Sequence, residues 1–501
     1  MSEIFGKKLP GTFNVDGKNI FGELTVDGGH SALRLRSEHF FNEQTMRDGC
    51  IQGTLHDLVK VSLFGCISAG TGQAGTQNER YFFAKVFPHI VISGYQHLKP
   101  NDETISTIRF VIDDAATLFC DFDAFGRVLQ PENYIENIAQ ANKEITHRDV
   151  KTGPEPEIVY FAGRREIFKA ETAIGTVSAS HNPEFSLMGG PRGVFIRNHI
   201  AVEIAFAPPV NLDKSLDGLL ALVRYFELLI GRQQNILDIA VILGDGASHE
   251  QHLKVDWNMA PQRSASSEEE HEPHSADILL NPIDDAKIFG DVLSAYLDRE
   301  QSWKAPRVRF AEKFNRRSSY DLDRLIAAAN LFDILPTPIF LPNQPISADL
   351  SAARDKARML FKALPQSADR DGVLNMLGRV GKASLKKKIA ERVRLISQKS
   401  GAYFPELAMV TEKAVNCRNY FVHGGDDPDF DYMANAQIVW FFVDTLEFVF
   451  GASDLIDAGW NVAAWLPKGS MMFHPFGEYK IEYSNGLDRL KRALAGGAID
   501  K

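Results

Sequence analysis

The sequence predicts an α+β multidomain protein, with an N-terminal antiparallel β-sandwich or barrel-like domain followed by a C-terminal all-α helical bundle. Residues 1 to about 210 hold short β-branched and aromatic runs, several of which alternate with period two between Gly, Asn, Asp and Pro turns. From about residue 283 onward, apolar residues recur almost throughout at helical spacing. Strands and helices are therefore segregated along the chain, which is typical of an α+β arrangement.

The expected strands follow one another as an antiparallel sheet requires. They are NIFGELTV (19–26), SALRLRS (31–37), LVKVSLFGCI (58–67), HIVISGYQ (89–96), TIRFVI (107–112), EIVYFAG (157–163) and IAVEIAFA (200–207). A helix at 215–232 is expected to close this unit, since its leucines lie three and four residues apart.

A chain of 501 residues is too long to fold around one ordinary hydrophobic core, so several domains are expected. We predict a β-rich sensor or regulatory domain at 1–240, a connector at 241–300 and a helical domain at 301–501. The connector contains the polar stretch APQRSASSEEEHEPHSAD (260–277), which has few large apolar residues and is expected to be an exposed loop.

Composition excludes several classes of protein. The four cysteines are scattered without a CxxC pair, which argues against a disulfide framework or a structural zinc site and fits a reducing cytoplasm. The N-terminus has no apolar signal region, and the apolar run IVWFFVDTLEFVF (438–450) is too short to span a bilayer. A cytoplasmic location without membrane contact is expected. The net charge of −10 argues against a broad nucleic-acid-coating surface, although a local basic site is compatible with it.

Two kinds of tempting motif are discounted. GTGQAG (70–75) matches the dinucleotide fingerprint, but the sequence after it reads as a strand and not as the required helix, so a hairpin loop is expected. HEQH (249–252) and HEPH (271–274) lack the spacing that places two imidazoles on one helical face, and solvated loop histidines are expected there. We predict no cofactor and no metal.

The stretch CRNYFVHGG (417–425) is the strongest candidate site. Arg418 and His423 form an R-x4-H pair, a spacing that chance supplies about once in a chain of this length. An earlier copy, Arg34 and His39, ends an alternating strand and is interpreted as surface decoration. The later copy follows an amphipathic helical run, carries Asn419 on the same helical face as His423, and ends in two glycines that stop a helix.

These residue types suit RNA cleavage. RNA carries its own nucleophile, the ribose 2′-hydroxyl, so an enzyme needs a proton acceptor near neutral pH and a fixed cation beside the phosphate. His423 and Arg418 would supply them, while Asn419 would donate to a phosphate oxygen or hold His423 in one tautomer. The structural alternative is that Arg418 pairs with a nearby acid and His423 only caps the helix.

The motif RNYFVH matches the R-N-x-x-x-H form of the HEPN ribonucleases, and the chain resembles the ApeA-type anti-phage proteins, whose HEPN domain follows a β-rich domain. The matching segments are LPGTFNVDGKNIFGELTV (9–26), YDLDRLIAAANLFDIL (320–335), ASLKKKIAERVRL (383–395), RNYFVHGG (418–425) and a long helix around 432–450. The resemblance implies a metal-independent endoribonuclease acting as a dimer, with Arg418, Asn419 and His423 at its site and Asp333 as the acid of the first bundle helix.

Asp333 is also unusual on physical grounds. It extends an apolar stripe and lies near a helix C-terminus, where the helix dipole disfavours an anion. Arg418 would be a suitable partner for it. A half-exposed acid beside the helix end is the alternative.

A basic segment accompanies the motif. Residues 379–399 hold eight Lys and Arg residues against the single acid Glu391. We predict an RNA-binding surface at Lys386, Lys387, Lys388 and Arg392. A solvated helix face is the alternative.

The expected function is therefore a metal-independent endoribonuclease of the HEPN type that acts in abortive infection. Its expected partners are an RNA substrate such as tRNA or another single-stranded loop, a phage-derived trigger, and a second copy bound through the helical domain, where the run at 438–450 offers more apolar surface than one bundle face hides. The alternative is a catalytically silent HEPN dimerisation module, with the β domain as a recognition unit.

Overall fold

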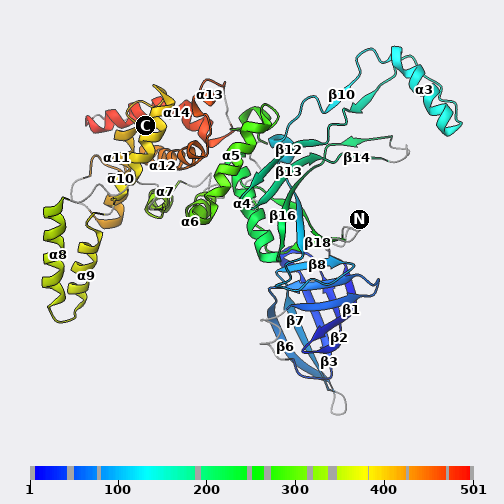
Figure 1. The fold of residues 1–501 in the computed structure, drawn as a ribbon, viewed down its shortest axis with the longest axis horizontal. Coiled ribbons are helices and arrows are strands. Elements are labelled where there is room, and N and C mark those ends of the chain that lie inside the picture. The colour runs from blue at the N-terminus through cyan, green and yellow to red at the C-terminus, as the bar shows by residue number, and fades with distance from the viewer. Residues whose placement is uncertain are drawn as a thin grey trace. The chain divides into compact units, whose positions relative to one another are not determined.

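The computed structural model describes residues 6–41, 50–75, 80–186, 193–244, 251–263, 272–312, 320–336, 347–381, 383–424, 428–469 and 473–496. The chain divides into two compact units (Figure 1). The first unit contains residues 1–229 and 234–297, and the second contains residues 230–233 and 298–501. The segment 241–300, which was expected to be a connector, supplies a strand and a helix to the first unit.

The strands of the first unit form one large sheet in which every described pairing is antiparallel, which confirms the predicted antiparallel β domain. The sheet order is β12-β13-β16-β9-β17-β18-β8-β5-β4-β1-β2-β3-β7-β6. The bounds are β1 (Lys8–Val15), β2 (Lys18–Thr25), β3 (Ala32–Ser37), β4 (Ile51–Leu55), β5 (Lys60–Phe64), β6 (Ile67–Gly75), β7 (Arg80–Phe87), β8 (Ile90–Gly94), β9 (Ile105–Ile112), β12 (Glu166–Thr172), β13 (Gly175–His181), β16 (Ile200–Val210), β17 (Ile236–Leu243) and β18 (Gln251–Trp257).

Two short ribbons complete the β structure. They are β10 (Phe125–Arg127) paired with β11 (Val159–Phe161), and β14 (Glu184–Phe185) paired with β15 (Ile196–Arg197). The predicted strand at 157–163 therefore lies in the first ribbon and outside the main sheet.

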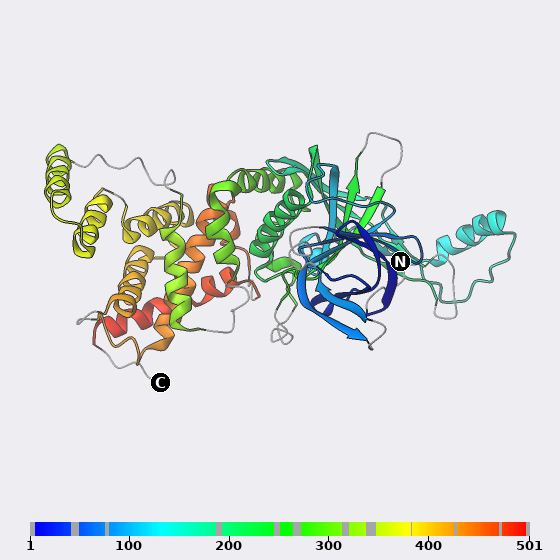
Figure 2. The same ribbon diagram turned by 90° about the horizontal axis from the view of Figure 1, so that it is seen from below.

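Strands β1–β8 form the barrel-like half of the sheet. Figure 2 shows these strands curving around one another. Their inward side chains, among them Phe13, Leu24, Leu33 and Leu63, are completely buried in one shared core. Strand β18 joins this half to the rest of the sheet, because it pairs with β8 on one side and with β17 on the other.

The other half of the sheet packs against helices α4 (Leu212–Ile230) and α5 (Ala286–Asp298). An aromatic cluster lies between them, with ring centroids 5.6 Å apart for Phe119 and Phe226 and 4.8 Å apart for Phe168 and Phe289. The predicted helix at 215–232 is thus confirmed as α4. The unit also contains α2 (Ala115–Leu118) and α3 (Glu132–Thr146).

The glycine-rich motif GTGQAG lies in strand β6. Gly70 pairs with Lys85 and Gly75 pairs with Arg80, so these glycines belong to a hairpin whose second strand is β7. The prediction of a hairpin was right, but the glycines form its strand and not its loop. Because a strand follows them, the helix N-terminus that a dinucleotide site requires is not provided here.

The second unit is helical. Its helices are α6 (Glu300–Ala311), α7 (Leu322–Asp333), α8 (Ala348–Lys362), α9 (Ala368–Arg379), α10 (Leu385–Ser400), α11 (Leu407–His423), α12 (Ala436–Asp457), α13 (Val462–Trp465) and α14 (Pro475–Leu494). Helices α8 and α9 pack against each other, and α8 buries none of its residues. Across the described parts of the chain, no helix combines the length and the apolar character needed to cross a membrane.

Helix α12 is the centre of the bundle, since α7, α10, α11 and α14 all pack against it. Its side chains from Ile438 to Ile456 are almost all buried, although Trp440 is 42% exposed. The run at 438–450 was predicted to offer apolar surface to a second copy of the chain, but other helices of the same chain cover α12. The dimer itself stays a prediction.

Two buried ion pairs tie α12 to its neighbours. The carboxylate of Asp454 accepts hydrogen bonds from Nε and Nη2 of Arg307 at 2.8 and 3.0 Å, and it lies 2.7 Å from Nη1 of Arg299. The carboxylate of Glu447 accepts bonds from Nε and Nη2 of Arg324 on α7 at 2.9 and 3.0 Å. The apolar core of the bundle therefore contains fixed charges that are neutralised in place.

Candidate active site

The R-x4-H motif ends helix α11. Gly424 follows the helix with a φ of +68°, and its N–H donates to the carbonyl of Tyr420 at 3.1 Å. The predicted helix stop is confirmed at this glycine, whose missing side chain permits the left-handed backbone. His423 is consequently the last residue of the helix, and its side chain is exposed to solvent.

The side chains of Arg418 and His423 meet at this helix end. Nη1 of Arg418 lies 3.4 Å from Nε2 of His423. A guanidinium has no lone pair to offer, so a hydrogen bond here requires a neutral imidazole with the Nε2 lone pair facing Arg418. An imidazole in that form is a proton acceptor.

Two asparagines fix the guanidinium of Arg418. Its Nη1 donates to Oδ1 of Asn419 at 3.1 Å, and its Nη2 donates to Oδ1 of Asn330 on α7 at 2.8 Å. Together with the contact to His423, these hydrogen bonds use three of the five N–H groups of Arg418. The N–H of its Nε is buried and has no hydrogen-bond partner among the described residues. The predicted Asn419 thus lies at the site, but it contacts Arg418, and no described hydrogen bond joins it to His423.

Asp333 does not occupy the position predicted for it. Its side chain is exposed at the end of α7, and the partner of Arg418 on this helix is Asn330, one turn earlier. The backbone carbonyl of Asp333 accepts a hydrogen bond from Nζ of Lys388 at 2.7 Å. A cation at a helix C-terminus stabilises the helix dipole, so this contact joins α10 to the end of α7.

Family profiles match both units. The profile for ApeA N-terminal domain 1 matches residues 8–296, and the profile for Apea-like HEPN matches residues 326–463. The chain belongs to the ApeA family. This assigns it to a family of anti-phage HEPN nucleases. No curated protein and no solved structure matches the chain.

The matched ApeA segments agree with the division of the structure. The first ends at residue 296, next to the end of the first unit at residue 297. The second includes Asn330, Arg418 and His423, so all contacts of the candidate site fall within the HEPN segment. Helix α14 and the start of α7 lie outside it.

The basic helix of the HEPN segment is α10. Its four predicted RNA-binding residues lie in different environments. Lys387 is exposed, Nζ of Lys386 lies 3.4 Å from the Glu412 carboxylate of α11, and Nζ of Lys388 donates to the carbonyl of Asp333 at the end of α7. The prediction for Arg392 was wrong. Its side chain is buried, forms an ion pair with Asp457 and lies over the Trp303 ring, so an RNA phosphate cannot reach it.

Asn330 is the site residue that sequence reasoning missed. It stands inside α7 between the buried residues Ala329 and Leu331. Asparagine is a poor residue for a helix interior, because its amide competes for backbone hydrogen bonds. In the sequence, an asparagine inside an apolar helical run, between Ala329 and Leu331, was the signal that could have identified this residue.

Cys417, beside Arg418, is a further group with the chemistry of a nucleophile. Burial, and then the Asp429 carboxylate, raise the pKa of its thiol to about 12. The thiolate is the reactive form of cysteine, so this side chain stays protonated and unreactive at neutral pH.

Two of the four histidines in the HEQH and HEPH motifs lie within the described residues. His252 is exposed on strand β18 and not in a loop as predicted, and Nδ1 of His274 accepts the N–H of Ala276 at 3.1 Å. His249 and His271 lie outside the described residues. Within the described ranges, no group of three or more His, Cys, Asp and Glu side chains is arranged to hold a metal ion.

Proposed function

We propose that this ApeA-family protein is an endoribonuclease that cleaves RNA by attack of the ribose 2′-hydroxyl on the adjacent phosphate. The observation that carries the proposal is the contact between Arg418 and His423 at the exposed end of α11. The alternative of a silent dimerisation module is less favoured, because an arginine held by Asn330 and Asn419 beside an accessible imidazole has no evident purpose in a scaffold.

In the proposed reaction, RNA displaces the contact between Nη1 of Arg418 and His423, and the Nε2 lone pair that this frees accepts the proton of the 2′-hydroxyl as its oxygen attacks phosphorus. The Nη1 N–H that His423 releases and the second N–H of Nη2 of Arg418 donate to the phosphate oxygens, where negative charge increases in the transition state. The 5′-oxygen leaves with a proton from water or from an imidazolium. The products are a 2′,3′-cyclic phosphate and a free 5′-hydroxyl.

Cleavage is expected to proceed in the presence of EDTA. The chemistry needs a base and a fixed cation, and the chain supplies both as side chains. We would incubate labelled tRNA and unstructured RNA with the purified protein, with and without EDTA, and identify the 3′ ends by mass spectrometry. A cleavage step that strictly requires a divalent ion, or products with 5′-phosphates, would contradict this mechanism.

Replacing Asn330 with alanine is expected to lower kcat about tenfold while KM changes less than about twofold. The Nη2 group of Arg418 would lose its 2.8 Å acceptor, so the guanidinium would be less well oriented for the transition state. Single-turnover and steady-state cleavage assays on one RNA would measure both constants.

Asn330→Asp separates this positioning role from a general structural one. Aspartate keeps an oxygen acceptor of the same reach, so this variant is expected to retain activity within about threefold of the wild type. Equal losses in the alanine and aspartate variants, or a loss that follows the melting temperature, would refute the positioning role.

We also propose a homodimer through the helical unit, in which two copies of the motif face one another. The support is the family membership and the exposed position of His423. Light scattering of the active protein is expected to give twice the chain mass of 55.8 kDa. A monomer with full activity would exclude the dimer as a requirement.

The first unit is proposed to regulate the nuclease in response to a phage-derived trigger, and the protein to act in the cytoplasm during abortive infection. Among the described residues of this unit, we find no cluster of metal-ligating side chains and no contact resembling that of Arg418 with His423.

The exposed Lys387 and the neighbouring Lys386 and Lys388 of α10 are proposed to contact the RNA backbone, a role that the buried Arg392 cannot share.

A further inference from the structure

An aromatic cluster lies beside the R-x4-H motif, at the end of α11. Tyr420 packs edge to face against Phe421 and against Tyr432, with ring centroids 5.2 and 5.4 Å apart. Tyr432 in turn packs against Phe430, with ring centroids 4.8 Å apart. Tyr432 is buried, whereas the other three side chains are partly exposed to solvent. None of these rings has a role in the proposed cleavage reaction.

The cluster is held in place by Asp429. Its carboxylate accepts hydrogen bonds from Nζ of Lys413 at 2.6 Å and Nδ2 of Asn416 at 3.0 Å, both on α11, and from the hydroxyl of Tyr432 at 3.2 Å. Burial acts to raise the pKa of the Asp429 carboxyl, but these hydrogen bonds and the Lys413 charge outweigh it and hold the pKa below its usual value. Burial, and then the Asp429 charge, raise the pKa of Tyr432, so its phenol stays protonated as a donor. The segment that carries Tyr432 is therefore fixed against α11.

The order of side chains around α11 places Tyr420 next to His423. Successive residues of an α-helix are about 100° apart, so Arg418, His423 and Tyr420 point outward at about 0°, 140° and 200°. His423 thus lies between the other two on the helix surface. Arg418 reaches it from one side through Nη1, and Tyr420 flanks it on the other.

This order matches the geometry of the proposed substrate. The ribose that carries the attacking 2′-hydroxyl lies on the 5′ side of the cleaved phosphate, and His423 accepts the proton of that hydroxyl. With the phosphate on the Arg418 side of His423, the base of this nucleotide extends toward the side where Tyr420 lies. Aromatic side chains stack on RNA bases, and every base has a π-face for this contact.

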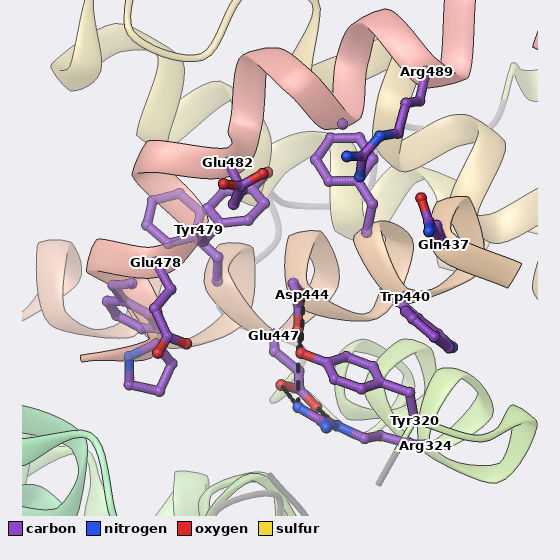
Figure 3. A pocket seen from close by; sticks show the side chains of 15 residues that line it. Tyr320, Arg324, Gln437, Trp440, Asp444, Glu447, Glu478, Tyr479, Glu482 and Arg489 are labelled. Carbon is purple, nitrogen blue, oxygen red and sulfur yellow. Dashed lines mark hydrogen bonds and ion pairs between the residues drawn. The ribbon is translucent and has the colours of Figure 1, made fainter. Parts of the chain in front are cut away.

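A cavity of about 500 Å³ in the helical unit lies elsewhere, among α7, α12 and α14 (Figure 3). None of its described lining residues belongs to α11 or to the segment 428–435. This cavity therefore does not adjoin the R-x4-H motif, whereas the partly exposed ring of Tyr420 does.

We propose that Tyr420 binds, by stacking, the base of the nucleotide whose 2′-hydroxyl attacks, while Tyr432 and Phe421 support its ring. The proposal rests on the proposed nuclease function and adds to it a subsite for the base on the 5′ side of the cleaved phosphate. Stacking reads no hydrogen-bond pattern, so this subsite requires an aromatic base but accepts all four. Purines bind more tightly through their larger ring system.

An RNA with one cleavable position tests this subsite. It is a 2′-O-methyl RNA with a single unmodified ribose that carries either adenine or no base, so the attacking hydroxyl is present in both forms. The full chain is expected to cleave the adenine form about tenfold faster than the abasic form. Tyr420→Leu should reduce this ratio to below about twofold, whereas Tyr420→Phe keeps the ring and should keep the ratio. The rate on the abasic form reports whether the motif is intact in each variant.

Tyr403→Leu is the matched control. It removes an exposed tyrosine that precedes the other end of α11, a helix about 25 Å long, and should leave the ratio at the wild-type value. A wild-type ratio near one, a ratio that Tyr420→Leu leaves unchanged, or equal losses in Tyr420→Leu and Tyr403→Leu would overturn the subsite.

Binding of a non-cleavable RNA separates this proposal from the nuclease proposal. The probe carries one 2′-deoxy-2-aminopurine nucleotide, whose fluorescence is quenched when its base stacks, between 2′-O-methyl nucleotides. At saturation, wild type and Tyr420→Phe are expected to quench it, and Tyr420→Leu is expected to quench it less. If neither the adenine nor the abasic substrate is cleaved, the nuclease proposal fails and the quenching alone decides the stacking. Equal quenching by wild type and Tyr420→Leu, or no binding of the probe, would refute it.

Discussion

Replacing His423 or Arg418 with alanine is expected to reduce RNA cleavage by a factor of about 10² to 10⁴. The first change removes the proton acceptor, and the second removes the cation that opposes charge on the phosphate. The Arg418 and His423 side chains act together, so the double variant should lose little more than either single variant. Cleavage rates on a defined RNA, with circular dichroism to check folding, measure the effect.

The chain contains a matched control for this experiment. Arg34 and His39 repeat the R-x4-H spacing, but both side chains are exposed in the β unit. Arg34→Ala/His39→Ala is expected to keep full activity, which would separate the site from the sequence pattern. Full activity in Arg418→Ala/His423→Ala would instead move the chemistry to another part of the chain.

The same variants extend the test to cells. Induction of the wild type, with and without phage infection, is expected to arrest growth under at least one condition, and His423→Ala should relieve the arrest. A growth arrest unchanged by His423→Ala at equal protein levels would contradict nuclease activity as its cause.

Replacing Asp454 with asparagine is expected to destabilise the helical unit by about 3 to 5 kcal/mol. The Asp454 side chain is 2% exposed, and its loss of charge would leave Arg307 and Arg299 without their buried counterion. Denaturant unfolding followed by helical circular dichroism would measure the free energy of unfolding. Asp488→Asn, at an exposed position of α14, is the matched control and should change the free energy of unfolding by less than about 0.5 kcal/mol.

Asp454 also gives this stability a defined pH dependence. Burial acts to raise the pKa of its carboxyl, but Arg307 and Arg299 outweigh it and hold the pKa below its usual value. The stabilisation is therefore complete above about pH 4, the pKa of an unfolded aspartate, and is lost as the pH falls through the lower folded value. In Asp454→Asn this acid-sensitive component should be absent, and an unchanged acid midpoint would contradict the assignment.

Much of the helical unit could be predicted because its signals are local. Apolar periodicity indicated helices from about residue 283 onward, the resemblance to ApeA-type proteins located α7, α10 and α12 among them, and the glycine after His423 located the end of α11. The roles of individual polar side chains were harder to predict, since they depend on neighbours distant in sequence. Arg392 was predicted to be on the surface because it lies in a basic run, yet it is buried over the Trp303 ring of α6 and forms an ion pair with Asp457 of α12.

The partner of Arg418 was mispredicted for a related reason. An acid on the first bundle helix suited its charge, and Asp333 was the matching position. In the structure, the helical rotation between residues 330 and 333 turns Asn330 toward α11, while Asp333 is exposed.

The order of the strands in the sheet could not be predicted from the sequence either, because the pairing of β8 with β18 joins strands about 160 residues apart.

The position of β18 affects the order in which the chain folds during synthesis. The sheet cannot be completed until Trp257 has been translated, because β18 bridges β17 and β8. Arg418 and His423 are made roughly 160 residues later, which at cellular rates of synthesis is roughly 10 to 30 s. The nascent β unit therefore has time to close on the ribosome before a complete nuclease motif exists, so the proposed regulatory unit matures before the activity it would restrain.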